Sequence, residues 1–105
     1  MSANQALSAS ELDEALATLP GWSLVTGTSA QELHKRFTFD SFAPAIAFMA
    51  SAVAPIDKLN HHPRWENVWN RVDVYLSTHD LGNKVSVRDV ELARLLDGLY
   101  SAGGH

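Results

Sequence analysis

Three of the five histidines in this 105-residue chain lie close together: His61 and His62 are adjacent, and His79 follows in the next segment. Histidine exchanges protons near neutral pH because its unperturbed pKa is about 6.5. A dehydration needs two such groups, one to protonate the departing hydroxyl and one to accept a proton from the adjacent atom. The cluster therefore predicts acid–base catalysis that needs neither a cofactor nor a covalent intermediate.

The residues beside the two adjacent histidines restrict how their rings can point. Pro63 disfavours the helical conformation at His62, so we expect a helical His61 beside an extended His62. Two rings that point in different directions suit two sides of a small ligand. Asp57 lies four residues before His61, and on a helix its carboxylate could orient the His61 ring or remain in solvent.

Structural roles compete with these functional ones. A histidine near a helix end is commonly structural or solvated, and we expect His34 and His105 to be solvated. A three-histidine metal site is a competing hypothesis, but we expect no metal, because adjacent histidines rarely chelate one ion. Asp89 is expected to cap a helix rather than act in catalysis. Trp65 could stack on a flat heterocycle or simply pack in the core.

The first part of the chain predicts a helix followed by two strands. Ser8–Glu11 matches a capping box ahead of leucines at helical spacing, and Pro20-Gly21 ends the run. Apolar and polar residues alternate over Trp22–Val25 and again from Gln31 to Phe39. This pattern is typical of strands with one solvent-exposed face.

A second helix should begin at Asp40 or Ser41 and end near Leu59. Pro55 cannot donate a backbone hydrogen bond and clashes with the preceding turn, so we expect a kink or a restart between Ala52 and Pro55. The predicted buried stripe of this helix consists of Phe42, Ala45, Ile46, Met49 and Val53.

The last part of the chain predicts two strands and a helix. The third strand should cover Val68 to Ser77, and a short fourth strand should contain Val85. Ser86–Asp89 matches a second capping box at the start of the last helix. The buried face of the third strand should carry Val68, Val72, Val74 and Leu76. The order α-β-β-α-β-β-α then predicts an α+β fold, with an antiparallel sheet covered by helices on one face.

Composition narrows the class of protein. Residues 1–105 fit a single domain, and a domain this small commonly gains buried surface by forming an oligomer. The net charge of -4 and the scattered basic residues argue against a nucleic-acid partner. The absence of cysteine excludes disulfides and thiolate chemistry. Met1–Leu7 lacks a secretory pattern and Phe42–Ile56 is too short to span a bilayer, so we expect a cytoplasmic protein without a membrane partner.

Taken together, the chemical residues form a longer motif: acidic-x-x-x-His-His-Pro-x-Trp, an aromatic residue in the next strand, Ser-Thr-His, and Arg-Asp at the start of the last helix. This motif resembles that of the pterin-4a-carbinolamine dehydratases, and the resemblance runs over nearly the whole chain. The motif residues are Asp57, His61, His62, Pro63, Trp65, Trp69, Ser77, Thr78, His79, Arg88 and Asp89. Asp57 stands where glutamate is commoner in the family, and Asn60 where aspartate is common.

The resemblance implies a fold, an assembly and a reaction. The fold is a four-stranded antiparallel sheet with three helices on one face, in dimers paired by strands and joined by helices into a tetramer. The reaction is the dehydration of 4a-hydroxytetrahydropterin to quinonoid dihydropterin, which recycles the cofactor of aromatic amino acid hydroxylases. His61 and His79 would be the acid/base pair, and His62 mainly a ligand of the pterin substrate. The pterin pocket would also be lined by Asn60, Ser77, Thr78 and Asp80.

A second hypothesis keeps the same fold without the chemistry. Some relatives of this family act as partners of other proteins, including as a dimerisation cofactor of a homeodomain transcription factor, and a fold alone does not determine function. A protein-binding or assembly module therefore remains the alternative. The three histidines favour the enzyme, because a scaffold has no physical need for them.

Overall fold

Two capping boxes begin the first and last helices, as the sequence predicts. In the computed structural model, which describes residues 5–28 and 30–105, Ser8 and Glu11 cap helix α1 (Ala9–Ala17). Ser86 and Asp89 cap helix α3 (Val87–Ala102) in the same way. The first four residues, on which the expected lack of a secretory segment partly depends, lie outside the described residues, as does Ser29.

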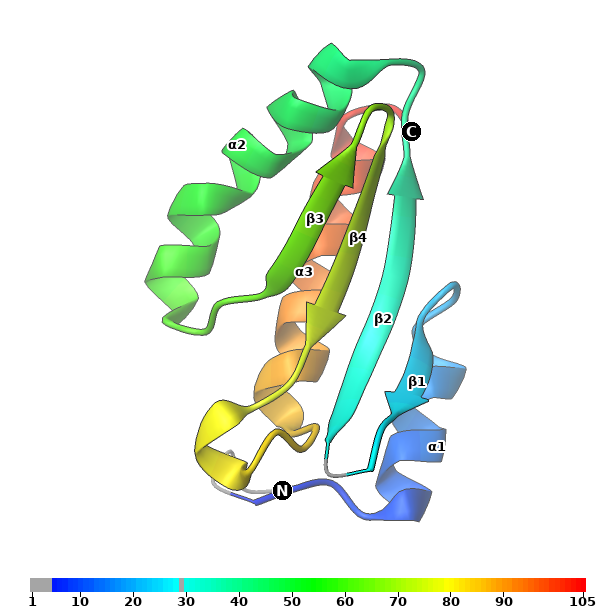
Figure 1. The fold of residues 1–105 in the computed structure, drawn as a ribbon, viewed down its shortest axis with the longest axis vertical. Helices are drawn as coiled ribbons and strands as arrows, with labels where there is room; N and C mark the ends of the chain where they lie inside the picture. The colour runs from blue at the N-terminus through cyan, green and yellow to red at the C-terminus, as the bar shows by residue number, and fades with distance from the viewer. Residues whose placement is uncertain (1–4, 29) are drawn as a thin grey trace.

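Four strands form one antiparallel sheet, and the helices cover one of its faces (Figure 1). The spatial order is β1-β2-β4-β3, so β1 and β3 are the edge strands. Period-two alternation puts the apolar side chains of β2 and β4 on the helix side and their polar ones on the open face. The strands are β1 (Ser23–Thr26), β2 (Gln31–Thr38), β3 (Arg64–Val68) and β4 (Arg71–Leu76). These features confirm the predicted fold class and element order.

The centre of the core is Phe37 of β2, which is fully buried. Its ring packs against Trp22, Phe48 and Tyr100 at centroid separations of 6.0, 5.0 and 5.0 Å. These contacts join the sheet to helix α2 (Phe42–Leu59) and to α3. The sheet and both long helices are thereby fixed relative to one another, which positions the loops at their ends.

The predicted third and fourth strands are wrong in their bounds. The segment from Val68 to Ser77 is not one strand, because the chain reverses at Trp69-Asn70 and divides it between β3 and β4. Val68 pairs with Arg71 on the open face and is exposed, instead of sharing the buried face of β4. Val85 is buried but lies outside any strand, next to the isolated bridge between Thr78 and Lys84. The predicted order is therefore right although two of its segments were misassigned.

Helix α2 has the predicted limits but not the predicted buried face. It begins after Ser41 and ends at Leu59 as expected, and it runs through Pro55 without a restart, so a kink is the part of that prediction that still stands. Its core-facing residues are Ala45, Phe48, Ala52 and Ile56, with Met49 partly buried. Phe42, Ile46 and Val53, which were predicted to be buried, are exposed. The helix is apolar on two faces, and the sheet covers only one of them.

The length of α2 also corrects the expectation that this stretch is too short to span a bilayer. Its 18 residues have a mean hydropathy of 1.3, enough for a membrane-crossing helix by length and composition alone. A single such helix is weak evidence, because core helices pass the same test. Ala45 and Ala52 are fully buried in the core.

Candidate active site

The loop after α2 brings His61 into the interior of the protein. Asn60 ends the helix in the left-handed conformation, with φ of 54°, and its N–H bonds the carbonyls of Ile56 and Asp57. Asparagine tolerates this conformation better than most residues. The chain therefore leaves the helix sharply, and only 8% of His61 stays exposed. The expectation that His61 is itself helical is wrong.

A buried carboxylate holds His61 in place. Asp89 is fully buried, and its Oδ1 lies 2.6 Å from Nε2 of His61. Its Oδ2 accepts hydrogen bonds from the Thr78 hydroxyl and the Ser86 backbone N–H, each at 2.9 Å. Asp89 is thus the helix cap that the sequence predicts, and it is also the partner of a candidate catalytic histidine.

The hydroxyls around Asp89 form a directed chain. Because the Thr78 hydroxyl donates to Asp89, the Ser86 hydroxyl must donate to Thr78 Oγ1, 2.6 Å away. The Ser86 Oγ accepts in turn from the Arg88 backbone N–H. An ionised Asp89 only accepts, so Nε2 of His61 carries the proton toward it and Nδ1 is left with a lone pair.

The Asp57 carboxylate pairs with His62 and not with His61. Asp57 Oδ1 lies 2.9 Å from Nε2 of His62, and both side chains are mostly exposed. The suggestion that Asp57 orients His61 is therefore wrong, because the helix ends before His61 and the two no longer share a helical face. An exposed pair of this kind contributes little to stability, so its effect is to aim the His62 ring.

His79 lies in a tight loop rather than at the end of a strand. Strand β4 ends at Leu76, and the short 3-10 helix η1 (His79–Leu81) follows. The loop closes on itself through the hydrogen bond from the Thr78 N–H to the Lys84 carbonyl. The His79 Nδ1 lies 3.2 Å from Asn83 Oδ1, so Nε2 is the nitrogen available to a ligand.

One hollow of about 250 Å³ unites the three histidines. Its rim contains the exposed rings of His62 and His79, and its floor contains the buried His61 and Thr78. All seven residues expected to contact substrate line it, and Arg88 lines it as well. The residues are Asn60, His61, His62, Ser77, Thr78, His79, Asp80 and Arg88. Arg88 was not assigned to the pocket from the sequence, although its place beside Asp89 was a signal for it.

The predicted supporting residues are distributed around this hollow. Asp57, Pro63 and Trp65 line a separate depression of about 150 Å³, which shares His62 with the histidine hollow. Trp65 is partly buried and packs on the core. Trp69 is in the turn at the other end of β4, so neither tryptophan lines the histidine hollow.

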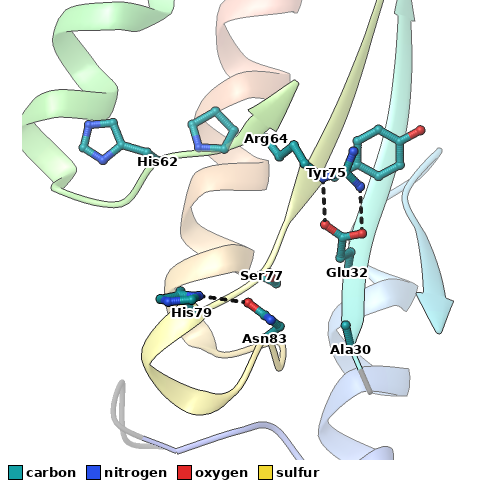
Figure 2. A pocket seen from close by; sticks show the side chains of 9 residues that line it. Ala30, Glu32, His62, Arg64, Tyr75, Ser77, His79 and Asn83 are labelled. Carbon is teal, nitrogen blue, oxygen red and sulfur yellow. Dashed lines mark hydrogen bonds and ion pairs between the residues drawn. The ribbon is translucent and has the colours of Figure 1, made fainter. Parts of the chain in front are cut away.

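A second hollow of about 390 Å³ adjoins the first one at the end of β4 (Figure 2). The two share His62, Ser77 and His79. On the side away from the histidines, Glu32 and Arg64 form an ion pair beside Tyr75. These three residues come from three adjacent strands and were not singled out from the sequence.

Of the two remaining histidines, His34 is less solvated than expected, whereas His105 is exposed as predicted. His34 stacks on Tyr75 and lies 2.9 Å from the buried Asp73 carboxylate, which also accepts from Arg36. Burial opposes ionisation of Asp73, but the hydrogen bonds from Arg36 and His34 outweigh it and lower the pKa of this carboxyl. His105 packs against Tyr100 and is still mostly exposed.

The arrangement of side chains gives no metal centre in the part of the chain that the structure describes. Within residues 5–28 and 30–105, no three or more His, Cys, Asp or Glu side chains are grouped so that they could hold an ion. What the hollow offers is imidazole rings at different depths, a buried carboxylate behind one of them, and polar groups at the rim. Such a set can move protons on a small polar ligand.

Comparison with known proteins points to one family. The family described as "Pterin 4 alpha carbinolamine dehydratase" matches residues 5–99. A protein of Opitutus terrae is 40% identical over 97 residues, which cover 92% of this chain and 96% of the relative. One from Rhizorhabdus wittichii is 44% identical over 89 residues, covering 85% and 89%. Both bear the provisional name of pterin-4-alpha-carbinolamine dehydratases.

Two solved structures have a similar fold. A transcriptional coactivator/pterin dehydratase from Brucella melitensis is 41% identical, with a TM-score of 0.83 over 91% of this chain and 99% of that one. A pterin dehydratase-like protein, identified as a RuBisCO assembly factor in the alpha-carboxysome, is 26% identical. Its TM-score is 0.62, over 76% of this chain and 89% of that one.

The burial of Asp89 predicts a large effect on stability. Replacing Asp89 with alanine leaves the Thr78 hydroxyl, the Ser86 N–H and the His61 ring without their acceptor, which should cost about 3–5 kcal/mol in the free energy of unfolding. Urea unfolding measures this directly. The exposed Glu91 on the same helix is the matched control, and Glu91→Ala should leave stability nearly unchanged. Equal effects of the two substitutions would contradict the network.

Proposed function

Since the chain belongs to the pterin-4a-carbinolamine dehydratase family, we propose that it removes water from 4a-hydroxytetrahydropterin to give quinonoid dihydropterin. The product returns to the pool of pterin cofactor used by aromatic amino acid hydroxylases. The observation that carries the proposal is the hollow itself, in which three histidines from two loops surround a space suited to a small ligand. One of those histidines is held by a buried carboxylate.

The reaction consists of two proton transfers. The bond between C4a and the hydroxyl oxygen breaks, and that oxygen takes up a proton and leaves as water. The neighbouring N5 gives up its proton, and the freed electron pair forms the C4a–N5 double bond. Atoms and electrons balance without any oxidant or reductant. An acid and a base on the protein, each worth about 10²–10⁴-fold in rate, are sufficient.

His61 is suited to act as the base. Its Nε2–H donates to Asp89, so its Nδ1 lone pair is free to take the proton from N5. The buried carboxylate would stabilise the positive charge that develops on the ring and would prevent the ring from turning. Asp89 therefore acts through His61 and is a positioning residue.

His79 is suited to act as the acid. Its Nδ1–H donates to Asn83 Oδ1, so Nε2 is the nitrogen left for the substrate, and in the doubly protonated ring the Nε2–H can protonate the departing hydroxyl. His62 lies on the exposed rim and would mainly hold the pterin ring, together with Asn60, Ser77 and Asp80. The Thr78 side chain is committed to Asp89, so its contribution is to shape the floor of the hollow.

An assembly role is the second candidate function. It is favoured by the similarity to a RuBisCO assembly factor and to a protein described as a transcriptional coactivator as well as a pterin dehydratase. Such a role needs a contact surface but no histidine chemistry. The two candidate functions differ in one requirement: the dehydratase needs the three histidines, and the assembly role does not.

We also propose that the chain forms a homodimer or homotetramer through α2. Phe42, Ile46 and Val53 expose an apolar face on the side of this helix that the sheet does not cover. Contiguous apolar surface of this kind marks contact sites on small domains. A second copy would cover the face with an identical one.

Sedimentation velocity tests this assembly. At micromolar concentration the chain should sediment as a dimer or tetramer, and Ile46→Glu should shift it toward the 11.5 kDa monomer, because it places a charge in the apolar contact. Val25→Glu introduces the same charge at an exposed apolar site on β1 and should leave the assembly intact. A wild-type protein that is monomeric throughout rules the assembly out.

Kinetics with freshly generated 4a-hydroxytetrahydropterin test the reaction and the division of roles. His61→Ala and His79→Ala should each lower kcat by about 10²–10⁴-fold, after the uncatalysed rate is subtracted. His62→Ala should raise KM more than it lowers kcat, because it removes binding common to substrate and transition state. His105→Ala lies outside the hollow and serves as the control. If all three variants keep wild-type kcat/KM, the assembly role becomes the better account.

Removal of metals provides an independent test of the chemistry. Exhaustive dialysis against a chelator should leave kcat and KM unchanged, because the proposed steps need only proton transfer. The measurement is the same dehydration assay before and after dialysis, with a metal analysis of the dialysed protein. Activity that is lost and then restored by zinc would replace the acid–base mechanism with a metal-dependent one.

A further inference from the structure

His79 differs from the other two histidines of the hollow in the charge of its hydrogen-bond partner. His61 and His62 each pair with a carboxylate, at 2.6 and 2.9 Å. His79 pairs with a neutral amide instead, because its Nδ1 lies 3.2 Å from Asn83 Oδ1 (Figure 2). The three rings that face one hollow are therefore held by partners of unequal charge.

The sheet fixes the backbone that carries the Asn83 amide. Asn83 and the preceding Gly82 both adopt the left-handed conformation, with φ of 62° and 72°, which asparagine and glycine tolerate. The Asn83 carbonyl accepts a hydrogen bond of 2.8 Å from the N–H of Gln31, at the start of β2. Two residues further on, the Val85 N–H donates to Gln31 Oε1 at 3.4 Å. Strand β2 thus anchors the segment from both of these residues.

The ring of His79 is exposed and depends on this anchored segment for its orientation. It belongs to the three-residue helix η1, and its side chain lies at the surface. The 2.8 Å hydrogen bond from the Thr78 N–H to the Lys84 carbonyl brings the two ends of the loop together. His79 and Asn83 are thereby held face to face, four positions apart in the chain.

An amide oxygen and a carboxylate act differently on an imidazole. Either one accepts from Nδ1–H, and so selects the tautomer in which Nε2 carries the lone pair. A carboxylate also attracts the protonated ring by its charge, which opposes the release of a proton. A neutral amide orients the ring without this attraction. It therefore suits a ring that has to give a proton to a substrate and regain one at the same nitrogen.

We propose that Asn83 is a positioning residue of the dehydration, which acts through His79: its amide selects the tautomer, and its neutrality makes this ring the acid. The inference rests on the proposed function and adds a residue to it. The Nε2–H proton passes to the departing hydroxyl, which leaves as water, and the ring becomes the neutral Nδ1–H form. Asn83 holds both forms, because Nδ1 keeps its proton throughout. Solvent then returns a proton to Nε2, while His61 releases the proton taken from N5.

Two substitutions of Asn83 separate the hydrogen bond from the charge in the dehydration assay. Asn83→Gly keeps the positive φ and removes the amide. It should lower kcat about fivefold and change KM by less than about twofold, because the ring loses its orienting partner. Asn83→Asp keeps the acceptor and should keep kcat near neutral pH. Its charge favours the protonated ring, so the alkaline limb of the kcat/KM profile should move up by about half a pH unit.

Lys84→Gln is the matched control for charge. It makes the same loop more negative by one unit, as Asn83→Asp does, but the Lys84 side chain is not among the residues that line either hollow. It should leave kcat unchanged and move the alkaline limb much less, because solvent screens its charge. The other titratable and charged groups that face His79 are the same in all variants. They are His61, His62, Asp80 and Arg88 in the histidine hollow, and Glu32, Arg64 and Tyr75 in the adjoining one.

Nitrogen NMR of the histidine rings provides a readout besides activity, with His79→Gln to assign the signals. At alkaline pH the neutral ring of His79 should be the Nδ1–H form in the wild type. The same form should persist in Asn83→Asp, with a higher titration midpoint, and it should lose its predominance in Asn83→Gly. Circular dichroism checks that each variant is folded.

The outcomes distinguish this role from the reaction itself. If the wild type dehydrates the substrate but neither Asn83 variant changes kcat or the alkaline limb, the positioning role is refuted and the dehydratase stands. A loss in Asn83→Gly that Asn83→Asp does not restore also refutes it, because such a loss reflects only the loop structure. If the wild type has no activity, the proposed reaction fails and the NMR decides. An Nδ1–H ring that depends on Asn83 supports the positioning of His79, and an Nε2–H ring in the wild type refutes it.

Discussion

The position of one buried carboxylate determines the geometry of the whole site. Asp89 lies in the first turn of α3 with no exposure to solvent, where a lone ionised carboxylate would be costly. Its acceptor capacity is used by groups from three segments: Ser86 before α3, Thr78 after β4, and His61 after α2. The start of α3, the end of β4 and the end of α2 therefore meet at one point. The histidine hollow is the space directly beside it.

In this arrangement the fold and the proposed chemistry depend on the same hydrogen bonds. The capping box that begins α3 also supplies the acceptor that fixes the His61 ring. His62 and His79 are held differently, by hydrogen bonds to exposed partners at the rim. One buried imidazole beside two exposed ones would suit the proposed reaction, in which one proton is removed and another is delivered on the same small molecule.

Local signals explain what the sequence could predict. Several correct predictions came from patterns within a few residues, and the structure agrees with them. They are both capping boxes, the limits of α2 and the polar–apolar alternation of β2. The Trp69-Asn70 turn was missed because tryptophan at a positive φ is rare in turns. The partner of His61 was misassigned because Asp57 is near in sequence, whereas Asp89 comes near only when α3 packs under the sheet. The Glu32–Arg64 ion pair beside Tyr75 joins three strands, so only the register of the sheet reveals it.

The central claim is that Asp89 acts on the reaction through His61. A double-mutant cycle on kcat/KM for the dehydration, using Asp89→Asn, His61→Ala and the combined variant, tests it most directly. Asparagine keeps the shape of the cap, and circular dichroism checks that each variant is folded at the assay temperature. The account predicts strong non-additivity: Asp89→Asn should lower kcat/KM in the wild-type background and hardly change it in the His61→Ala background. Losses that simply multiply would show that Asp89 and His61 act independently, and would contradict it.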